Sequence, residues 1–292
     1  MDNRSEVRDF LISRRGKVTP EQVGLAAGGG ARRVAGLRRS EVAQLAGVSV
    51  EYYTQLERGS IRGASQSVLD AVARALLLDE AERTHLFDLA RAAQSGAAVR
   101  RRPAGQRVRP VIQQILDGQL SPAWVFNRRG DIVAVNSLGR ALNSPLFDDP
   151  ARPVNIARFR FLNPRAADYF RDWDNTAREI VAVLRVEAGK NPYDKALSDL
   201  IGELSTRGEE FRTRWATHDV RLHRTGIKRL HHPVVGDLEL AYEGIELPAD
   251  PGLNLVIYTA EPGSATQQAL NLLASWSATE VQRQQQPADR PS

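Results

Sequence analysis

Cysteine is absent from this 292-residue sequence. Its absence excludes disulfide bonds, thiolate zinc sites and cysteine nucleophiles. Long apolar runs are also missing, because no stretch approaches the roughly 20 apolar residues that a membrane-spanning helix needs. The first residues, MDNRSEVRDF, lack the apolar segment of a secretory signal. We therefore expect a cytoplasmic protein, and the length predicts two domains with ordinary apolar cores.

Lysine is scarce, and positive charge is unevenly distributed along the chain. Only four of the 40 basic residues are lysines, which leaves 36 arginines. Residues 1–110 contain 19 basic and 12 acidic residues, a net charge of +7, whereas the remainder contains 21 and 23, a net charge of −2. The basic N-terminal part is therefore the candidate for binding a polyanion such as nucleic acid.

Two short helices are predicted for residues 40–46 and 49–57, in the stretch SEVAQLAGVSVEYYTQLERG. Each has apolar residues at helical spacing, so each buries one face. Gly47 permits a sharp turn between them, and Ser49 can cap the second helix. The leading end of the second helix is then free to enter a major groove of duplex DNA. A helical hairpin with a purely structural role fits the pattern alone equally well.

The surroundings of these helices favour DNA binding. Arginines precede and follow the pair, and three further helices, at about 4–14, 65–78 and 80–93, complete a five-helix all-α domain within residues 1–98. One recognition helix reads only a few base pairs, which favours a homodimer on a double-stranded DNA operator. The residues that we expect to contact bases or phosphates are Arg38, Arg39, Ser40, Ser49, Val50, Glu51, Tyr52, Thr54, Gln55, Arg58 and Arg62.

The stretch EVAQLAGVSVEYYTQLERG resembles the helix-turn-helix of the xenobiotic-response-element (XRE) class of bacterial repressors. The resemblance implies that residues 40–46 form the positioning helix and residues 49–57 the recognition helix. The sequence departs from the family pattern by a Gly/Arg-rich arm, residues 28–39, which either follows the minor groove or forms a loop. The resemblance rests on Ala43, Gly47, Val48, Ser49, Leu56, Glu57 and Gly59.

The composition and the hydrophobic pattern of the sequence change after residue 98. Residues 99–109 are rich in arginine, lack periodicity and predict a basic linker. The following pattern predicts a helix, a hairpin with Gly130 at its turn, several helices, three strands and a last helix. This order is typical of an α+β domain, an antiparallel sheet with helices, over residues 110–280. Residues 281–292 are expected to be a disordered tail.

The phrases RFRFLNP, DYFRDWDNTAREIVAVLR and LVIYTAEPGS resemble, in order, the MmyB-like ligand-binding domain of bacterial transcription regulators. The resemblance implies a PAS-like domain whose interior accepts a fatty acid or a similar small amphiphile. An acyl chain needs apolar lining and a polar anchor for its carboxylate. The residues that we expect to bind this ligand are Phe126, Asn136, Arg160, Phe161, Trp173, Arg178, Leu184, Trp215 and His218. Core packing, surface ion pairs and helix capping are the alternative roles of these residues.

No motif in the sequence predicts catalysis. A phosphate-binding Gly-rich loop with its lysine and a G-x-S-x-G elbow are both absent. His218, His223, His231 and His232 could be drawn as a metal site, but the first two are five residues apart on a presumed strand and would face opposite sides.

We therefore expect neither an enzyme nor a metal or other cofactor, but a transcription regulator that binds DNA and senses an amphiphile. The main alternative is a DNA-binding protein whose second domain is a ligand-free dimerisation or protein-interaction module. A weaker alternative is a hydrolase or metalloenzyme fused to a DNA-binding domain.

Overall fold

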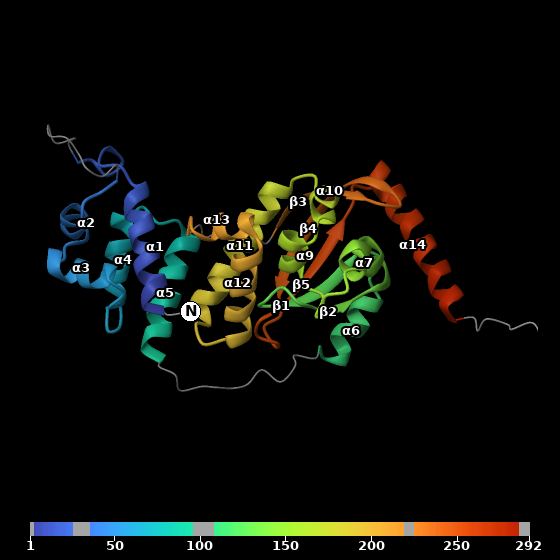
Figure 1. The fold of residues 1–292 in the computed structure, drawn as a ribbon, viewed down its shortest axis with the longest axis horizontal. Coiled ribbons are helices and arrows are strands. Elements are labelled where there is room, and N and C mark those ends of the chain that lie inside the picture. Colours follow the sequence, from blue (N-terminus) through green and yellow to red (C-terminus); the bar gives the residue numbers. More distant parts are fainter. Residues whose placement is uncertain (1–2, 26–35, 96–107, 219–224, 286–292) are drawn as a thin grey trace, which may run out of the picture. The chain divides into compact units, whose positions relative to one another are not determined.

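The computed structural model describes residues 3–25, 36–95, 108–218 and 225–285. It divides into two compact units (Figure 1). The first unit comprises residues 1–101 and 181–222, and the second comprises residues 102–180 and 223–292. Most of the predicted Gly/Arg-rich arm and of the predicted basic linker lies outside the described residues. The domain bounds given above stay a prediction.

Five α-helices open the first unit, as the hydrophobic periodicity predicts. They surround one apolar core that includes Phe10, Leu37, Tyr53, Leu69 and Leu86. After the first helix, the Thr19 N–H donates a hydrogen bond of 2.8 Å to Gln22 Oε1, and one 3-10 turn follows. The helices are α1 Asn3–Lys17, α2 Arg39–Ala46, α3 Val50–Glu57, α4 Gln66–Ala75 and α5 Glu80–Ser95, with η1 Glu21–Val23 after α1.

The turn between α2 and α3 has the geometry that the sequence predicts. Gly47 ends α2 in the left-handed conformation, at φ 66°, where its N–H bonds the carbonyls of Ala43 and Gln44. Ser49 begins α3, and its Oγ accepts a hydrogen bond of 3.0 Å from the Tyr52 N–H. The predicted turn at Gly47 and the predicted cap at Ser49 are therefore confirmed, and they fix the direction in which α3 leaves the core.

Three more helical segments belong to the first unit, although they come from the part of the chain predicted as the second domain. The division between the units falls within α11, Trp173–Lys190, and α12, Lys195–Arg207, and α13, Glu209–Trp215, follow it. Val186 of α11 lies in the same apolar core as the helices of the helix-turn-helix region. The core of the first unit therefore combines residues far apart in the sequence.

The second unit contains a five-stranded antiparallel sheet with the strand order β2-β1-β5-β4-β3. The predicted hairpin is confirmed, and Gly130 occupies its turn at φ 79°. Trp124 of β1 pairs with Val256 of β5, and Tyr258 of β5 pairs with Tyr242 of β4. The strands are β1 Ala123–Asn127, β2 Ile132–Val135, β3 Thr225–His232, β4 Gly236–Glu246 and β5 Leu253–Thr259.

Helices cover the two faces of this sheet unequally. On one face α6, Pro110–Asp117, packs Ile112 and Leu116 against Val125 and Leu255. The opposite face carries a larger, aromatic-rich core that includes Phe159 of α9 and residues of α14. The remaining helices are α7 Ser137–Leu142, α8 Ser144–Phe147, α9 Ile156–Leu162, α10 Arg165–Tyr169 and α14 Ala265–Gln285, with the first turns of α11.

Helix α14 is longer than the periodicity indicated. Residues 281–285, predicted to belong to a disordered tail, continue the helix. The physical reason is that no glycine or proline interrupts the segment from Ala265 until Pro287.

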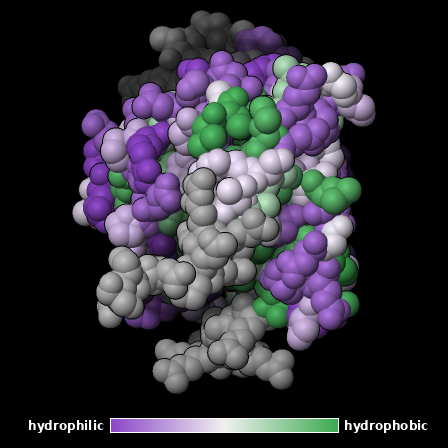
Figure 2. All heavy atoms as spheres, turned by 90° about the vertical axis from the view of Figure 1, so that its right-hand side faces the viewer, coloured by the Kyte–Doolittle hydropathy of each residue, from purple (hydrophilic) through white to green (hydrophobic). Residues whose placement is uncertain are grey.

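The face that Figure 2 shows is largely hydrophilic, with separate apolar patches. None of the described helices is long and apolar enough to cross a membrane.

Candidate nucleic-acid interface and ligand site

Helix α3 has one buried and one exposed face. Tyr53, Leu56 and Glu57 face the core, whereas Val50 and Tyr52 are exposed. Each of the predicted DNA contacts is exposed except Thr54, which is half-buried. The exposed set is Arg38, Arg39, Ser40, Ser49, Val50, Glu51, Tyr52, Gln55, Arg58 and Arg62. The first unit thus has an exposed helix terminus, with exposed arginines before and after the helix in the sequence. The individual contacts with DNA stay a prediction.

A buried carboxylate fixes α3 to two neighbouring helices. Glu57 is 1% exposed; its Oε2 lies 2.6 Å from Arg15 Nε on α1, and its Oε1 lies 2.8 Å from Arg39 Nε on α2. Burial opposes its ionisation, but the hydrogen bonds and charges of Arg15 and Arg39 prevail and hold its pKa below the ordinary value. Arg39 therefore has a structural contact besides its predicted contact with phosphate.

Glu57 was not predicted as a functional residue, although the sequence contained a signal for it. Tyr53, Leu56 and Glu57 have the spacing i, i+3, i+4, which puts the carboxylate on the apolar face of the helix. A buried acidic residue requires a cationic partner. Because several arginines lie nearby in the sequence, the sequence did not indicate which of them is the partner of Glu57.

We predict that Gln55→Ala changes which bases the protein prefers, by about 1–3 kcal/mol at one position of the operator. Arg62→Ala is expected instead to weaken binding to all sequences alike and to flatten the log–log salt dependence by about 0.9 if one phosphate contact is lost. Selection of operators from random duplexes, followed by titration at several salt concentrations, measures both. Equal sequence preferences for Gln55→Ala and the wild type would contradict the first expectation.

Three predicted ligand residues come together in the second unit. Arg160 and Phe161 lie on α9, and Trp173 begins α11. The indole of Trp173 packs edge-on against the Phe161 ring, with centroids 6.0 Å apart, and its Nε1 donates to the Arg160 carbonyl at 3.3 Å. Phe126 lies on β1 at the edge of the same aromatic-rich core.

Arg160 is a buried cation. It is 4% exposed, its Nη1 donates to Thr176 Oγ1, and its guanidinium carbon lies 3.2 Å from the centroid of the Phe170 ring. Burial lowers its pKa to about 9, although the charges of Tyr258 and Glu179 act in the opposite direction. Within the described ranges no carboxylate forms an ion pair with Arg160, and its Nε has no hydrogen-bond partner.

Two other predicted anchors have structural partners. Asn136 caps α7, and its side chain accepts from the N–H groups of Ala123 and Gly139 and donates to two carbonyls. These four bonds leave it little capacity for a ligand. Arg178 is about half exposed and pairs with Asp174 one turn earlier in α11. Ligand contacts by these two residues stay predictions that the observed geometry does not favour.

The remaining predicted ligand residues, Leu184, Trp215 and His218, lie in the first unit and not with the sheet. The expectation that His218 lies on a strand is wrong: it follows α13 in a turn, at φ 53°. His223 lies outside the described residues. Over the ranges that the structure describes, no group of three His, Asp or Glu side chains is placed to hold a metal ion.

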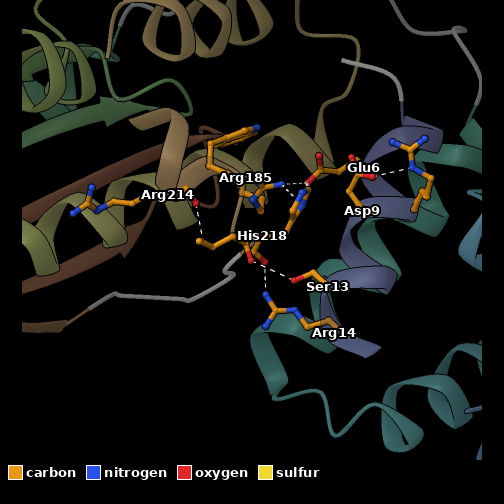
Figure 3. A network of polar contacts seen from close by, with 10 residues as sticks. Glu6, Asp9, Ser13, Arg14, Arg185, Arg214 and His218 are labelled. Atoms are coloured by element: carbon orange, nitrogen blue, oxygen red, sulfur yellow. Dashed lines mark hydrogen bonds and ion pairs between the residues drawn. The ribbon is translucent and has the colours of Figure 1, made fainter. Parts of the chain in front are cut away.

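A polar network surrounds His218 (Figure 3). Arg185 of α11 is fully buried; it donates to Glu6 of α1 and to the Trp215 carbonyl, and its Nη1 lies 2.8 Å from His218 Nδ1. Its guanidinium carbon also lies 4.0 Å from the centroid of the Trp215 ring. Arg14 of α1 donates to the His218 carbonyl. The network therefore joins α1 to α11 and to the end of α13.

His85 of α5 lies beside this network and is almost entirely buried. Its ring meets Phe10 edge-on, with centroids 5.1 Å apart, and neither ring nitrogen has a hydrogen-bond partner among the described residues. Burial, together with the positive charges of Arg185 and Arg14, lowers its pKa to about 3. His85 is therefore neutral in the folded protein at ordinary pH.

We predict that acid destabilises the first unit through His85. The unfolded chain binds a proton at this residue near pH 6.5, whereas the folded chain binds it only near pH 3. Stability is therefore complete above pH 6.5 and falls as the pH drops below that value, by up to about 1.4 kcal/mol per pH unit. Urea unfolding between pH 7 and 5 measures the slope. His85→Leu should flatten it, and an unchanged slope would contradict this assignment.

The comparisons with known proteins agree with this architecture. Residues 30–86 match the model of a helix-turn-helix domain, and residues 108–273 match that of the MmyB-like transcription regulator ligand binding domain. The chain belongs to the MmyB-like family. The two resemblances seen in the sequence are thereby confirmed. A comparison with curated proteins finds no match.

Membership of the MmyB-like family establishes the general role of the chain. A helix-turn-helix DNA-binding domain combined with an MmyB-like ligand-binding domain makes it a ligand-sensing transcription regulator. The MmyB-like match is to a family of transcription regulators. The MmyB-like match also includes α12 and α13, which belong to the first unit together with the helix-turn-helix.

Proposed function

We propose that this regulator binds operator DNA as a homodimer through α3, and that its second unit binds a fatty acid or a related acyl compound whose carboxylate pairs with Arg160. The observation that supports the ligand is the buried guanidinium of Arg160, which has no carboxylate partner in the described part of the chain. Leaving a buried cation without a counter-charge is costly, so a carboxylate-bearing ligand gains a strong, charge-assisted interaction there.

The nearby acidic residue does not fill this role. Glu179 forms an ion pair with Lys228 of β3, and both side chains are mostly buried. Because that carboxylate is already neutralised, Arg160 is the cation left to attract an anionic head group. Thr176, which accepts a hydrogen bond from Arg160, holds the guanidinium in place on one side.

The aromatic core beside Arg160 supports an apolar tail on this ligand. Trp124 stacks on Tyr258 with centroids 4.8 Å apart, and Phe170 lies against the guanidinium itself. An acyl chain among such side chains gains about 0.8 kcal/mol for each buried methylene. Affinity should therefore rise with chain length until the available apolar surface is used and then stop rising.

The DNA half of the proposal is supported by the exposed leading end of α3 and its arginines. Two copies related by a two-fold axis would read a pseudo-palindromic operator with half-sites about 34 Å apart. Light scattering of the protein bound to its selected operator tests this pairing. One chain per operator would contradict the homodimer.

The ligand is tested on the purified full-length protein. Extraction with organic solvent and mass spectrometry identifies any bound acyl compound, and calorimetry with saturated fatty acids of graded length measures affinity. The expected result is binding that strengthens with length to a limit and changes operator affinity, because only a ligand that binds two states unequally can shift their populations. A lipid-free extract and no heat at any length would favour the ligand-free interaction module instead.

A further inference from the structure

Helix α1 has two buried faces that contact different partners. Glu6, Phe10 and Arg14 are spaced four residues apart and form one face, and Val7, Leu11 and Arg15 have the same spacing on the adjacent face. Glu6, Val7, Phe10, Leu11 and Arg14 are each at most 5% exposed. A helix buried on two sides cannot shift against one partner without disturbing the other.

The first face meets helices that belong to the MmyB-like match. Glu6 pairs with Arg185, and Arg14 donates to the His218 carbonyl, as Figure 3 shows. Ser13 Oγ, on the same side of the helix, donates to the Thr217 carbonyl at 3.3 Å. Each of these contacts joins α1 to the α11 and α13 segments within the first unit.

The second face meets the recognition helix. Arg15 donates to both carboxylate oxygens of Glu57, at 2.6 Å and 3.1 Å. Val7 and Leu11 lie in the same apolar core as Tyr53 and Leu56 of α3. The position of α3 therefore depends on where α1 lies.

Helix α11 also takes part in the proposed ligand site. Thr176 accepts a hydrogen bond from Arg160, and Arg185 lies nine residues further along the same helix. We propose that the junction of α11 with α1 and α5, centred on Arg185 and Gly189, is a regulatory contact that sets the DNA affinity of α3. The further step, that ligand binding acts on DNA affinity through this junction, rests on the function proposed above.

Replacing Gly189 with alanine adds one methyl group at this junction and thereby tests it. It is buried against His85 of α5, and a Cβ at this position would lie 2.5 Å from His85 Cε1 and 2.9 Å from Nδ1. Gly189→Ala therefore forces α11 and α5 to adjust. Gly202 of α12, in the same unit, is exposed, and a Cβ there meets nothing within 4 Å. Gly202→Ala is the matched control.

The experiment measures operator affinity of the full-length wild type, Gly189→Ala and Gly202→Ala without ligand, after circular dichroism has verified folding. We expect Gly189→Ala to change the operator dissociation constant at least about fivefold, the lower end of typical allosteric couplings. Gly202→Ala should stay within about twofold of the wild type. A folded Gly189→Ala variant with wild-type operator affinity would overturn the proposal.

A second pair of variants decides the question if Gly189→Ala does not fold. Glu6→Leu/Arg185→Met replaces the buried ion pair with apolar side chains of similar size, which buried sites commonly tolerate. Its control, Lys195→Met/Asp199→Leu, removes an exposed pair on α12. A change in operator affinity of at least about fivefold in the first variant alone supports the junction, and equal affinities overturn it. Because neither comparison uses a ligand, failure of the fatty-acid proposal is recognised separately, as a lipid-free extract.

Discussion

Glu57→Ala is expected to lower the free energy of unfolding of the first unit by about 3 kcal/mol, because removing one partner of a buried ion pair leaves an uncompensated charge. Arg15 is 14% exposed at its side chain and would lose both hydrogen bonds to the carboxylate. Arg39 is half exposed and can turn to water, which limits the loss. Operator binding should weaken as well, since α3 loses its ion pairs with α1 and α2.

Glu51→Ala is the matched control, because Glu51 lies on the same helix but is exposed. Urea unfolding of both variants at neutral pH gives the comparison. The Glu57 contribution should also disappear in acid: a carboxyl whose folded pKa is depressed stabilises above its unfolded pKa and loses that effect as the pH falls through the folded value. Similar stabilities for the two variants would show that Glu57 contributes nothing beyond its helix propensity.

Arg160→Met is expected to weaken fatty-acid binding about 10- to 100-fold, because a hydrogen-bonded charge contributes about 1.5–3 kcal/mol and 1.4 kcal/mol corresponds to a factor of ten. Without ligand, the same variant should be as stable as the wild type or about 1 kcal/mol more stable, since an unpaired buried cation has been replaced by an apolar side chain. Loss of binding together with retained stability separates a ligand anchor from a residue that only supports the fold.

Arg178→Met provides the control for this comparison. Arg178 is exposed and pairs with Asp174, so its loss should leave both ligand affinity and stability nearly unchanged. Calorimetry with one fatty acid and thermal unfolding without ligand supply the two measurements. If Arg178→Met weakened binding as strongly as Arg160→Met, the carboxylate would have to be assigned to the surface of α11.

The local features of the fold could be predicted from the sequence because they depend on neighbouring residues. The turn at Gly47 and the cap at Ser49 are examples. The spacing of Asp79 and Glu82 is likewise that of a capping box, and both of its hydrogen bonds are present. The length of α14 was underestimated because its polar C-terminal part has no apolar stripe, although nothing in it breaks a helix.

The partners of buried faces could not be predicted. Periodicity indicates that Val181, Leu184 and their neighbours on α11 are buried but not what covers them, and Val186 packs in the core of the first unit. The residue that anchors the ligand carboxylate could not be predicted from the sequence for the same reason. Arg160 and Arg178 were equal candidates in the sequence, and only burial distinguishes them, because Arg160 is 4% exposed and the Arg178 side chain 54%.

The contribution of Val186 to the core of the first unit has a consequence for synthesis on the ribosome. Residues 3–95 emerge first, but Arg185 and Val186, which contact them, are made about 90 residues later. At about 5–20 residues per second, the delay is roughly 5–18 s. During that interval Glu6 lacks Arg185, and the surface that will receive Val186 faces water or a chaperone. The DNA-binding helices therefore reach their final packing only after much of the MmyB-like region has been made.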